Sequence, residues 1–323
     1  MVLCLFSACS PWWKAEQDPS CANIVKIVRF DKAVDDFVRT GNVAFSQRLS
    51  TDYPMETRIL VENMLHLGSV ADELIYGELR AYYCHAGLEQ LSADVRKRFA
   101  NLSVYERQLG AALNRLKSEL PGLRRPYVYT QISGFRQSIV VSDTLVGISL
   151  DKYMGADYPA YARFFTPVQR GTMTPGRMVP DLLSFYLMAQ FPPREEHKEL
   201  IYAMIQIGKI QWAVAQALDT NTASASGFSE ASVQWLQRNE QACWRTLKQR
   251  NLLFSTQYDV FASLVPLTAE HPYFGDESSR GAGTWMGTQV VRNYMRKHPE
   301  CTLYDLLARI SCRAIWEGSD YAS

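Results

Sequence analysis

The chain has 323 residues, of which 47% are hydrophobic and 21% are charged, and its formal net charge is +1. These values are typical of a globular protein and give no reason to expect nucleic acid or an anionic surface as a partner. No apolar run approaches the roughly 18 residues that a membrane-spanning helix needs, so membrane attachment would depend on a lipid.

The first residues have the pattern of a bacterial lipoprotein signal. The apolar and small residues Leu5–Ala8 precede Cys9, where a signal peptidase would cut and the cysteine would be acylated. The run is shorter than a usual signal and lacks a preceding Lys or Arg, so an ordinary buried N-terminal segment is the alternative. We expect a partial signal peptide at 1–8, whose start lies upstream of Met1, and a lipidated Cys9 with a tether over 9–23.

The cysteines are spread irregularly and predict no disulfide framework. There are seven: Cys4, Cys9, Cys21, Cys84, Cys243, Cys301 and Cys312. Processing would remove the first and acylate the second, which leaves an odd number without any CxxC pair. We therefore expect the remaining cysteines to be small buried hydrophobic residues.

Residues 24–121 have a helical pattern and form the predicted N-terminal part. Ser103 to Glu106 has the sequence of a capping box, and Leu109, Leu113, Leu116 and Leu120 follow at helical spacing. Pro121-Gly122 then predicts the end of this helix.

Three short strands are predicted after Arg125. Residues 127–132, 137–141 and 145–150 are rich in aromatic and β-branched residues and are joined by short turns. We interpret them as an antiparallel meander.

Helices return in the last third of the chain. The predicted ones are 179–190, about 195–218, 230–249 with Ser229 as N-cap, one ending near Lys297, one capped by Thr302 and Asp305, and a last turn from Ser311. The fold class is therefore α+β and predominantly α-helical, with residues 122–323 as the core and 24–323 as one continuous globular unit.

Motifs for metal and nucleotide chemistry are missing from the sequence. The histidines are His66, His85, His197, His271 and His298, and no two are four residues apart, so HExxH is absent. There is no GxSxG or Walker loop, and Met286 occupies the third glycine position of the motif that Gly281 and Gly283 begin. We expect no metal, no cofactor and no nucleotide.

Several glycines and charged residues in the predicted helices have two interpretations each. Gly208 marks a close approach of another element or a functional position, and Gly283 either permits close packing or begins an anion-binding helix N-terminus beside Arg280. For Gly283, together with Gly287 four residues later, packing is the favoured interpretation, and both interpretations of Gly208 stay open. Glu240 is expected to be a surface residue rather than a buried functional one, and Lys209 to extend its charge to solvent rather than face a cleft.

Seven segments of the sequence, taken in chain order, carry a resemblance to a known family. They are 127–134 (YVYTQISG), 146–153 (VGISLDKY), 190–192 (QFP), 200–209 (LIYAMIQIGK), Asn239-Glu240 with Trp244, 280–295 (RGAGTWMGTQVVRNYM) and 319–321 (SDY). Together they resemble the GldB family of gliding-motility lipoproteins from Bacteroidetes. The resemblance covers about residues 24–321. It implies a cell-envelope lipoprotein that gliding bacteria require for motility and for the associated protein-secretion machinery.

The resemblance also implies a zincin-like scaffold, because the family fold is similar to that of a family described as zinc peptidases. In those relatives a helix like 200–218 follows a small antiparallel sheet and carries HExxH. Here Met204 and Gly208 occupy the two histidine positions and Ile205 that of the general base, and none can perform these roles. The resemblance therefore implies a metallopeptidase-like scaffold that has lost its metal. The candidate binding cleft on this scaffold consists of Gly208, Lys209, Glu240, Arg280, Gly281, Gly283 and Trp285.

The leading hypothesis is a non-catalytic, lipid-anchored envelope protein facing the periplasm or the cell surface. Its expected partners are the membrane, through the lipid, and other envelope or secretion-machinery proteins. The alternative is an envelope hydrolase that uses the same cleft with Glu240, Lys209 or Arg280. A binding module for a peptide or a glycan is a third hypothesis, which depends only on the 12% aromatic content.

Overall fold

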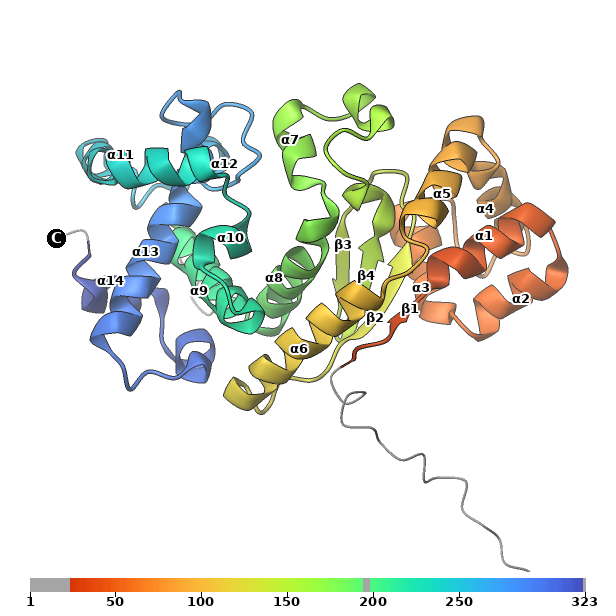
Figure 1. Ribbon diagram of the computed structural model, residues 1–323, viewed down its shortest axis with the longest axis horizontal. Helices are drawn as coiled ribbons and strands as arrows, with labels where there is room; N and C mark the ends of the chain where they lie inside the picture. The colour runs from red at the N-terminus through yellow and green to blue at the C-terminus, as the bar shows by residue number, and fades with distance from the viewer. Residues whose placement is uncertain (1–23, 194–197, 322–323) are drawn as a thin grey trace, which may run out of the picture.

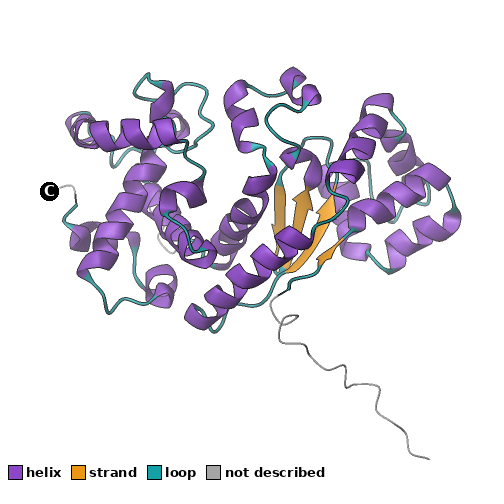
Figure 2. Ribbon diagram, in the orientation of Figure 1, coloured by secondary structure: helices purple, strands orange, loops and turns teal. Residues whose placement is uncertain are grey.

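The computed structural model describes residues 24–193 and 198–321 (Figure 1). The predicted signal, Cys9 and the tether lie outside these ranges, as do Cys4, Cys21 and His197. The chain is mostly helical with one small mixed sheet, which confirms the α+β class. Figure 2 shows the sheet between the helices of residues 30–98 and the helices that follow the sheet in sequence, with the helix of residues 103–119 running in front of it.

Of the helices that precede residue 127, those of residues 30–98 lie beside the edge of the sheet formed by residues 27–28 (Figure 1), and the one of residues 103–119 packs against the helix of residues 200–218. They are α1 (Phe30–Thr40), α2 (Val43–Thr51), α3 (Pro54–Arg58), a π-helical stretch (Ile59–Met64), α4 (Ile75–Tyr83), α5 (Ala86–Arg98) and α6 (Ser103–Glu119). The leucine stripe of α6 is buried as predicted. The predicted capping box is wrong, because the first N–H of α6, that of Ser103, donates to Asn101 Oδ1 at 2.8 Å, and Glu106 accepts a hydrogen bond from the backbone N–H of Ile27 at 3.0 Å.

The sheet is mixed, so the predicted antiparallel meander is wrong. Its order is β1 (Ile27–Val28), β2 (Tyr127–Gln131), β4 (Leu145–Ser149) and β3 (Ile139–Ser142), and only the β3–β4 pair is antiparallel. Strands β2 and β4 are buried on both faces, as parallel central strands usually are, so no alternation reveals their direction. The prediction of an entirely helical 24–121 region missed β1, which has only two residues.

The helices after the sheet confirm the predicted caps. They are α7 (Pro167–Thr172), α8 (Met178–Gln190), α9 (Leu200–Leu218), α10 (Thr222–Ser226), α11 (Glu230–Gln249), α12 (Tyr258–Leu264), α13 (Ala282–Lys297) and α14 (Cys312–Ser319). Ser229 and Ser311 accept hydrogen bonds from the N–H groups of Ser232 and Ala314. The backbone N–H of Asp305 donates to Thr302 Oγ1 at 3.1 Å, which confirms that cap too.

The hydrophobic core extends through both groups of helices. Helix α8 packs on β3 and β4, and α9 packs against α6, α8 and α13. The buried core residues run from Val25 to Ile315. Within the described ranges, no helix combines the length and apolar character needed to cross a membrane.

Candidate functional site

Helices α9 and α13 cross with their backbones in contact. A Cβ placed on Gly287 would lie 1.9 Å from the carbonyl oxygen of Met204, and one on Gly208 would lie 2.5 Å from the carbonyl oxygen of Gly287. The two glycines therefore allow an approach that any side chain would prevent. Of the two interpretations of Gly208 this contact supports the close approach of another element, and the favoured packing interpretation is confirmed for Gly287. Met204 and Ile205 are fully buried in the same region.

The N-terminal end of α13 is also occupied by protein. Gly281 adopts a left-handed backbone with φ of 73°, which favours glycine, and directly precedes the helix. A Cβ on Gly283 would lie 3.1 Å from Val265 Cγ2 and 3.2 Å from the carbonyl oxygen of Leu264. Packing therefore explains Gly283 without an anion.

Lys209 is buried, so the prediction that it extends its charge to solvent is wrong. Its side chain is only 4% exposed, and Nζ donates a hydrogen bond to the carbonyl oxygen of Ile310 at 3.0 Å. This acceptor lies 101 residues further along the chain. The local helix pattern therefore did not reveal it.

Glu240 is half-buried and holds two elements together, which corrects the expectation of an ordinary surface residue. Its carboxylate accepts a hydrogen bond from Trp285 Nε1 at 3.1 Å and another from the hydroxyl of Tyr321. Burial, and then the Glu240 carboxylate, raise the pKa of Tyr321 above its ordinary value, so the tyrosine stays a donor. The contact ties the end of the chain to α11 and α13.

Arg280 has its own set of backbone partners. Its side chain is 12% exposed, Nε donates to the carbonyl oxygen of Ala269 at 2.8 Å, and one terminal nitrogen donates to that of Glu277 at 3.2 Å. It lines a depression of about 320 Å³ together with Ser229 and Phe228. Trp285 packs edge-on against Phe228 at 5.8 Å between ring centres.

The seven residues of the predicted cleft therefore do not share one cavity. Glu240 and Trp285 meet, Gly208 belongs to the α9–α13 crossing, and Lys209 binds a different segment. Of the seven, Arg280 is the one that lines a prominent cavity of the described chain.

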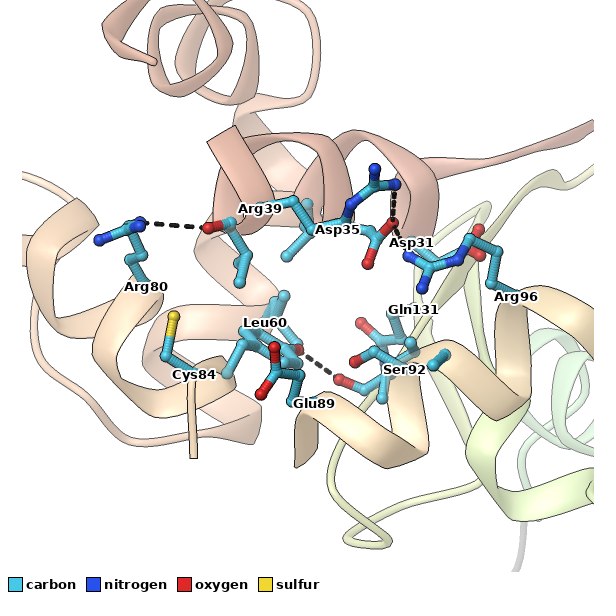
Figure 3. A pocket seen from close by; sticks show the side chains of 15 residues that line it. Asp31, Asp35, Arg39, Leu60, Arg80, Cys84, Glu89, Ser92, Arg96 and Gln131 are labelled. Atoms are coloured by element: carbon cyan, nitrogen blue, oxygen red, sulfur yellow. Dashed lines mark hydrogen bonds and ion pairs between the residues drawn. The ribbon is translucent and has the colours of Figure 1, made fainter. Parts of the chain in front are cut away.

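A cavity that the sequence analysis did not identify lies at the carboxyl end of β2. It has a volume of about 420 Å³, and we name it the strand-end cavity (Figure 3). One face of α1 lines it with Asp31, Val34, Asp35, Val38 and Arg39. The rest of its wall is Arg80, Tyr83 and Cys84 from the end of α4, Glu89, Ser92, Ala93 and Arg96 from α5, and Leu60, Gln131 and Ile132.

The acidic groups of the strand-end cavity differ in their pairing. Asp31 is 5% exposed, and its carboxylate accepts hydrogen bonds from Arg29 Nε at 2.8 Å and Arg29 Nη2 at 2.7 Å. It also accepts a hydrogen bond from the hydroxyl of Thr130. Asp35 pairs with Arg96 and, at 3.6 Å, with Arg39. Asp31 is thus a structural carboxylate, whereas Asp35 is shared between two arginines near the solvent.

Gln131 is the buried polar residue of this cavity. It is 0% exposed, and its Nε2 donates to Ser149 Oγ at 3.3 Å. Its Oε1 is buried and accepts no hydrogen bond within the described part of the chain. Such a group is uncommon, because an unpaired buried acceptor costs roughly 1–3 kcal/mol.

The ends of the neighbouring parallel strands carry a second buried polar group. Asp151, just after β4, accepts hydrogen bonds from the backbone N–H groups of Ser133 at 2.9 Å and Phe135 at 2.6 Å. Burial raises the pKa of Asp151 despite these bonds, which lower it. The carboxylate holds a turn in which Gly134 and Phe135 both have positive φ.

The sequence contained one signal for this edge. Gln131 is an amide residue that follows Thr130 near the end of the strand segment 127–132, and ligand sites in α/β sheets lie at the carboxyl ends of parallel strands. That rule was not applicable to an antiparallel meander. The mistaken strand direction therefore concealed the cavity.

Metal-binding geometry is not found in residues 24–193 and 198–321. No three His, Cys, Asp or Glu side chains there are grouped so that they could hold an ion. Among the described cysteines, Cys243 and Cys312 are buried as expected. The expectation of burial is wrong for Cys84, which is exposed at the strand-end cavity, and Cys301 is half-buried.

Comparison with known proteins identifies a family. The family described as gliding motility protein GldB matches residues 13–323, which is nearly the whole chain. Neither a curated protein nor a solved structure matches significantly. The chain belongs to the GldB family of gliding motility proteins.

Proposed function

We propose that this protein is a lipid-anchored cell-envelope component that binds or assembles other envelope or secretion-machinery proteins and catalyses no reaction. Membership of the GldB family supports a gliding-motility lipoprotein role. The side of the membrane and the non-catalytic character belong to the proposal, as does descent from a zincin-like scaffold.

The observation that carries the non-catalytic proposal is the α9–α13 crossing. Met204 and Gly208 have the spacing of the two histidines in the zinc-peptidase relatives, but a thioether and a hydrogen replace both imidazoles. Both positions lie in the helix interface, where Gly287 touches the backbone of Met204. Neither the ligands nor the open coordination position of a catalytic zinc site is provided here.

The hydrolase alternative has less support. A hydrolytic site needs an acid or base and a stabilising cation at one reacting bond. Glu240, Lys209 and Arg280 instead have separate partners, which are Trp285 with Tyr321, the Ile310 carbonyl, and the Ala269 carbonyl. The peptide or glycan module gains no specific contact either, because the aromatic clusters are largely in the core.

Lipid attachment is tested by metabolic labelling in the native organism. Cells receive an alkyne fatty acid, and the labelled protein is compared between wild type and Cys9→Ala, both expressed from the native gene. Cys21→Ala is the matched control, because it removes a nearby cysteine outside the proposed signal. We expect labelling to be lost in Cys9→Ala alone, and equal labelling of all three would contradict the anchor.

The non-catalytic role is tested by Glu240→Gln and Arg280→Gln in the same cells. Glu240→Gln keeps the shape of the side chain and removes its charge, and Arg280→Gln removes the charge and shortens the side chain. Motility close to wild type at wild-type protein abundance is the expected result. Loss of motility with abundance and folding unchanged would favour the hydrolase alternative.

A further inference from the structure

The strand-end cavity has the size and shape of a small-molecule site. Its volume of about 420 Å³ falls in the range of roughly 300–1,000 Å³ that is usual for ligand pockets. Val34, Leu60 and Ile132 give it an apolar interior, and all three are nearly fully buried. An apolar interior with a few directed polar groups is the composition expected of such sites.

The polar group at the inner end of the cavity is the side-chain oxygen of Gln131, a hydrogen-bond acceptor without a donor among the described residues. Gln131 is held by its hydrogen bond to Ser149, so its amide is fixed in place. Its oxygen, buried and without a partner among the described residues, gains a hydrogen bond only from a donor that enters the cavity. A hydroxyl or an N–H group on a ligand meets this requirement.

The polar group at the outer end of the cavity is the guanidinium of Arg80, which forms no ion pair with a carboxylate of the described residues. Arg39 and Arg96 share Asp35, whereas Arg80 has no ion pair within the described ranges and uses Nε on the carbonyl oxygen of Val38 at 3.1 Å. Its two terminal nitrogens have the geometry that matches a carboxylate. Figure 3 shows Arg80 and Gln131 on opposite sides of the cavity.

We propose that the strand-end cavity binds a small amphipathic carboxylate. Its carboxylate lies at Arg80, its apolar body lies against Val34, Leu60 and Ile132, and a hydroxyl or N–H group at its far end donates to Gln131 Oε1. This binding site is separate from the α9–α13 crossing. It is therefore independent of the proposed assembly function, which does not involve Gln131 or Arg80.

The test uses 3-(4-hydroxyphenyl)propionate, which has these three parts in this order. Binding to the purified chain is measured by calorimetry beside 3-phenylpropionate, which lacks the donor, and tyramine, which replaces the carboxylate by an ammonium group. We expect saturable binding of the hydroxy acid, with each comparison compound about tenfold weaker or more. No saturable binding of the hydroxy acid up to about 10 mM would overturn the proposal.

Two substitutions separate the two ends of the ligand. Arg80→Gln is expected to weaken both acids about tenfold and to preserve the preference for the hydroxyl group. Gln131→Leu is expected to abolish that preference and to leave 3-phenylpropionate bound. Arg313→Gln, which changes an exposed arginine of α14, is the matched control and should alter nothing. Affinities that neither Arg80→Gln nor Gln131→Leu changes would overturn the proposal.

Cys84 provides a readout that needs no variant. This exposed thiol lines the strand-end cavity, and the half-buried Cys301 lies elsewhere. Alkylation by iodoacetamide is followed for each cysteine by peptide mass spectrometry. Saturating hydroxy acid should slow alkylation of Cys84 severalfold and leave Cys301 unchanged. An unchanged rate at Cys84 under saturation would place the ligand elsewhere and overturn the proposal.

Discussion

The α9–α13 crossing and the strand-end cavity differ in what fills the space between their elements. At the crossing, Gly208 and Gly287 bring two backbones into contact. At the cavity, faces of α1, α4 and α5 stay apart around about 420 Å³, beside the unpaired oxygen of Gln131. The comparison teaches that the glycines of α9 and α13 serve packing, whereas the open polar site lies at the carboxyl end of a strand.

The largest expected effect is at the crossing. Gly287→Ala should lower the free energy of unfolding by more than about 3 kcal/mol, because its Cβ would meet the Met204 carbonyl oxygen at 1.9 Å and the helices must separate. Denaturant unfolding measures this. Gly77→Ala in α4 is the matched control, since nothing lies within 4 Å of its Cβ, and it should stabilise the protein by up to about 1 kcal/mol. Similar effects of both substitutions would show that the crossing is not closed.

The next prediction concerns the strand ends, where burial raises the pKa of Asp151 above its ordinary 3.8. The folded state then holds the proton more tightly, so this stabilising contribution is complete below pH 3.8 and is lost as pH rises through the folded pKa. Asp151→Asn cannot titrate. Between pH 3.8 and the folded pKa of Asp151, the free energy of unfolding of the wild type minus that of Asp151→Asn should fall by up to about 1.4 kcal/mol per pH unit.

Urea unfolding of both proteins across this pH range measures the difference, in which the titration of all other groups largely cancels. Ser149→Ala, at the end of β4 two residues before Asp151, is the control. It removes a neutral hydroxyl, so its difference from wild type should not change with pH. A difference that grows with pH would mean that the folded pKa of Asp151 is lowered.

A smaller effect is expected at the contact between Glu240 and the C-terminal residues. Tyr321→Phe removes the hydroxyl that donates to Glu240 and keeps the ring, which packs against Trp244 at 6.3 Å between ring centres. The half-buried position limits the loss of unfolding free energy to about 1 kcal/mol. Denaturant unfolding measures the loss, and Tyr304→Phe, at a half-exposed tyrosine, is the control. If Tyr321→Phe lowered the free energy of unfolding as much as Gly287→Ala, the prediction would be wrong, and the Glu240–Tyr321 hydrogen bond would matter as much for stability as the helix crossing.

Local signals allowed most of the helices to be predicted. Helix α11 has the predicted bounds 230–249 because its cap, Ser229, lies beside it in sequence. The Thr302–Asp305 cap and the leucine stripe of α6 depend on similarly short spacings. These features need no knowledge of distant residues.

Long-range pairing set the limit of prediction. Strands β2 and β4 pair in parallel and are buried on both faces, so no alternation of polar and apolar residues in the sequence indicated their direction. The acceptor of Lys209 is 101 residues away. The strand-end cavity is lined by faces of three helices and by the end of one strand, which are far apart in the sequence. In the strand segment itself, Gln131 was the residue that could have indicated the cavity.

The zinc content of the purified full chain tests the central claim, that the crossing is closed by packing, most directly. The protein is equilibrated with excess zinc, dialysed, and analysed by plasma mass spectrometry beside Met204→Leu. We predict far less than one retained zinc per chain and no difference between the two proteins, because no ligand pair is available at Met204 and Gly208. One tightly held zinc per chain would contradict the account.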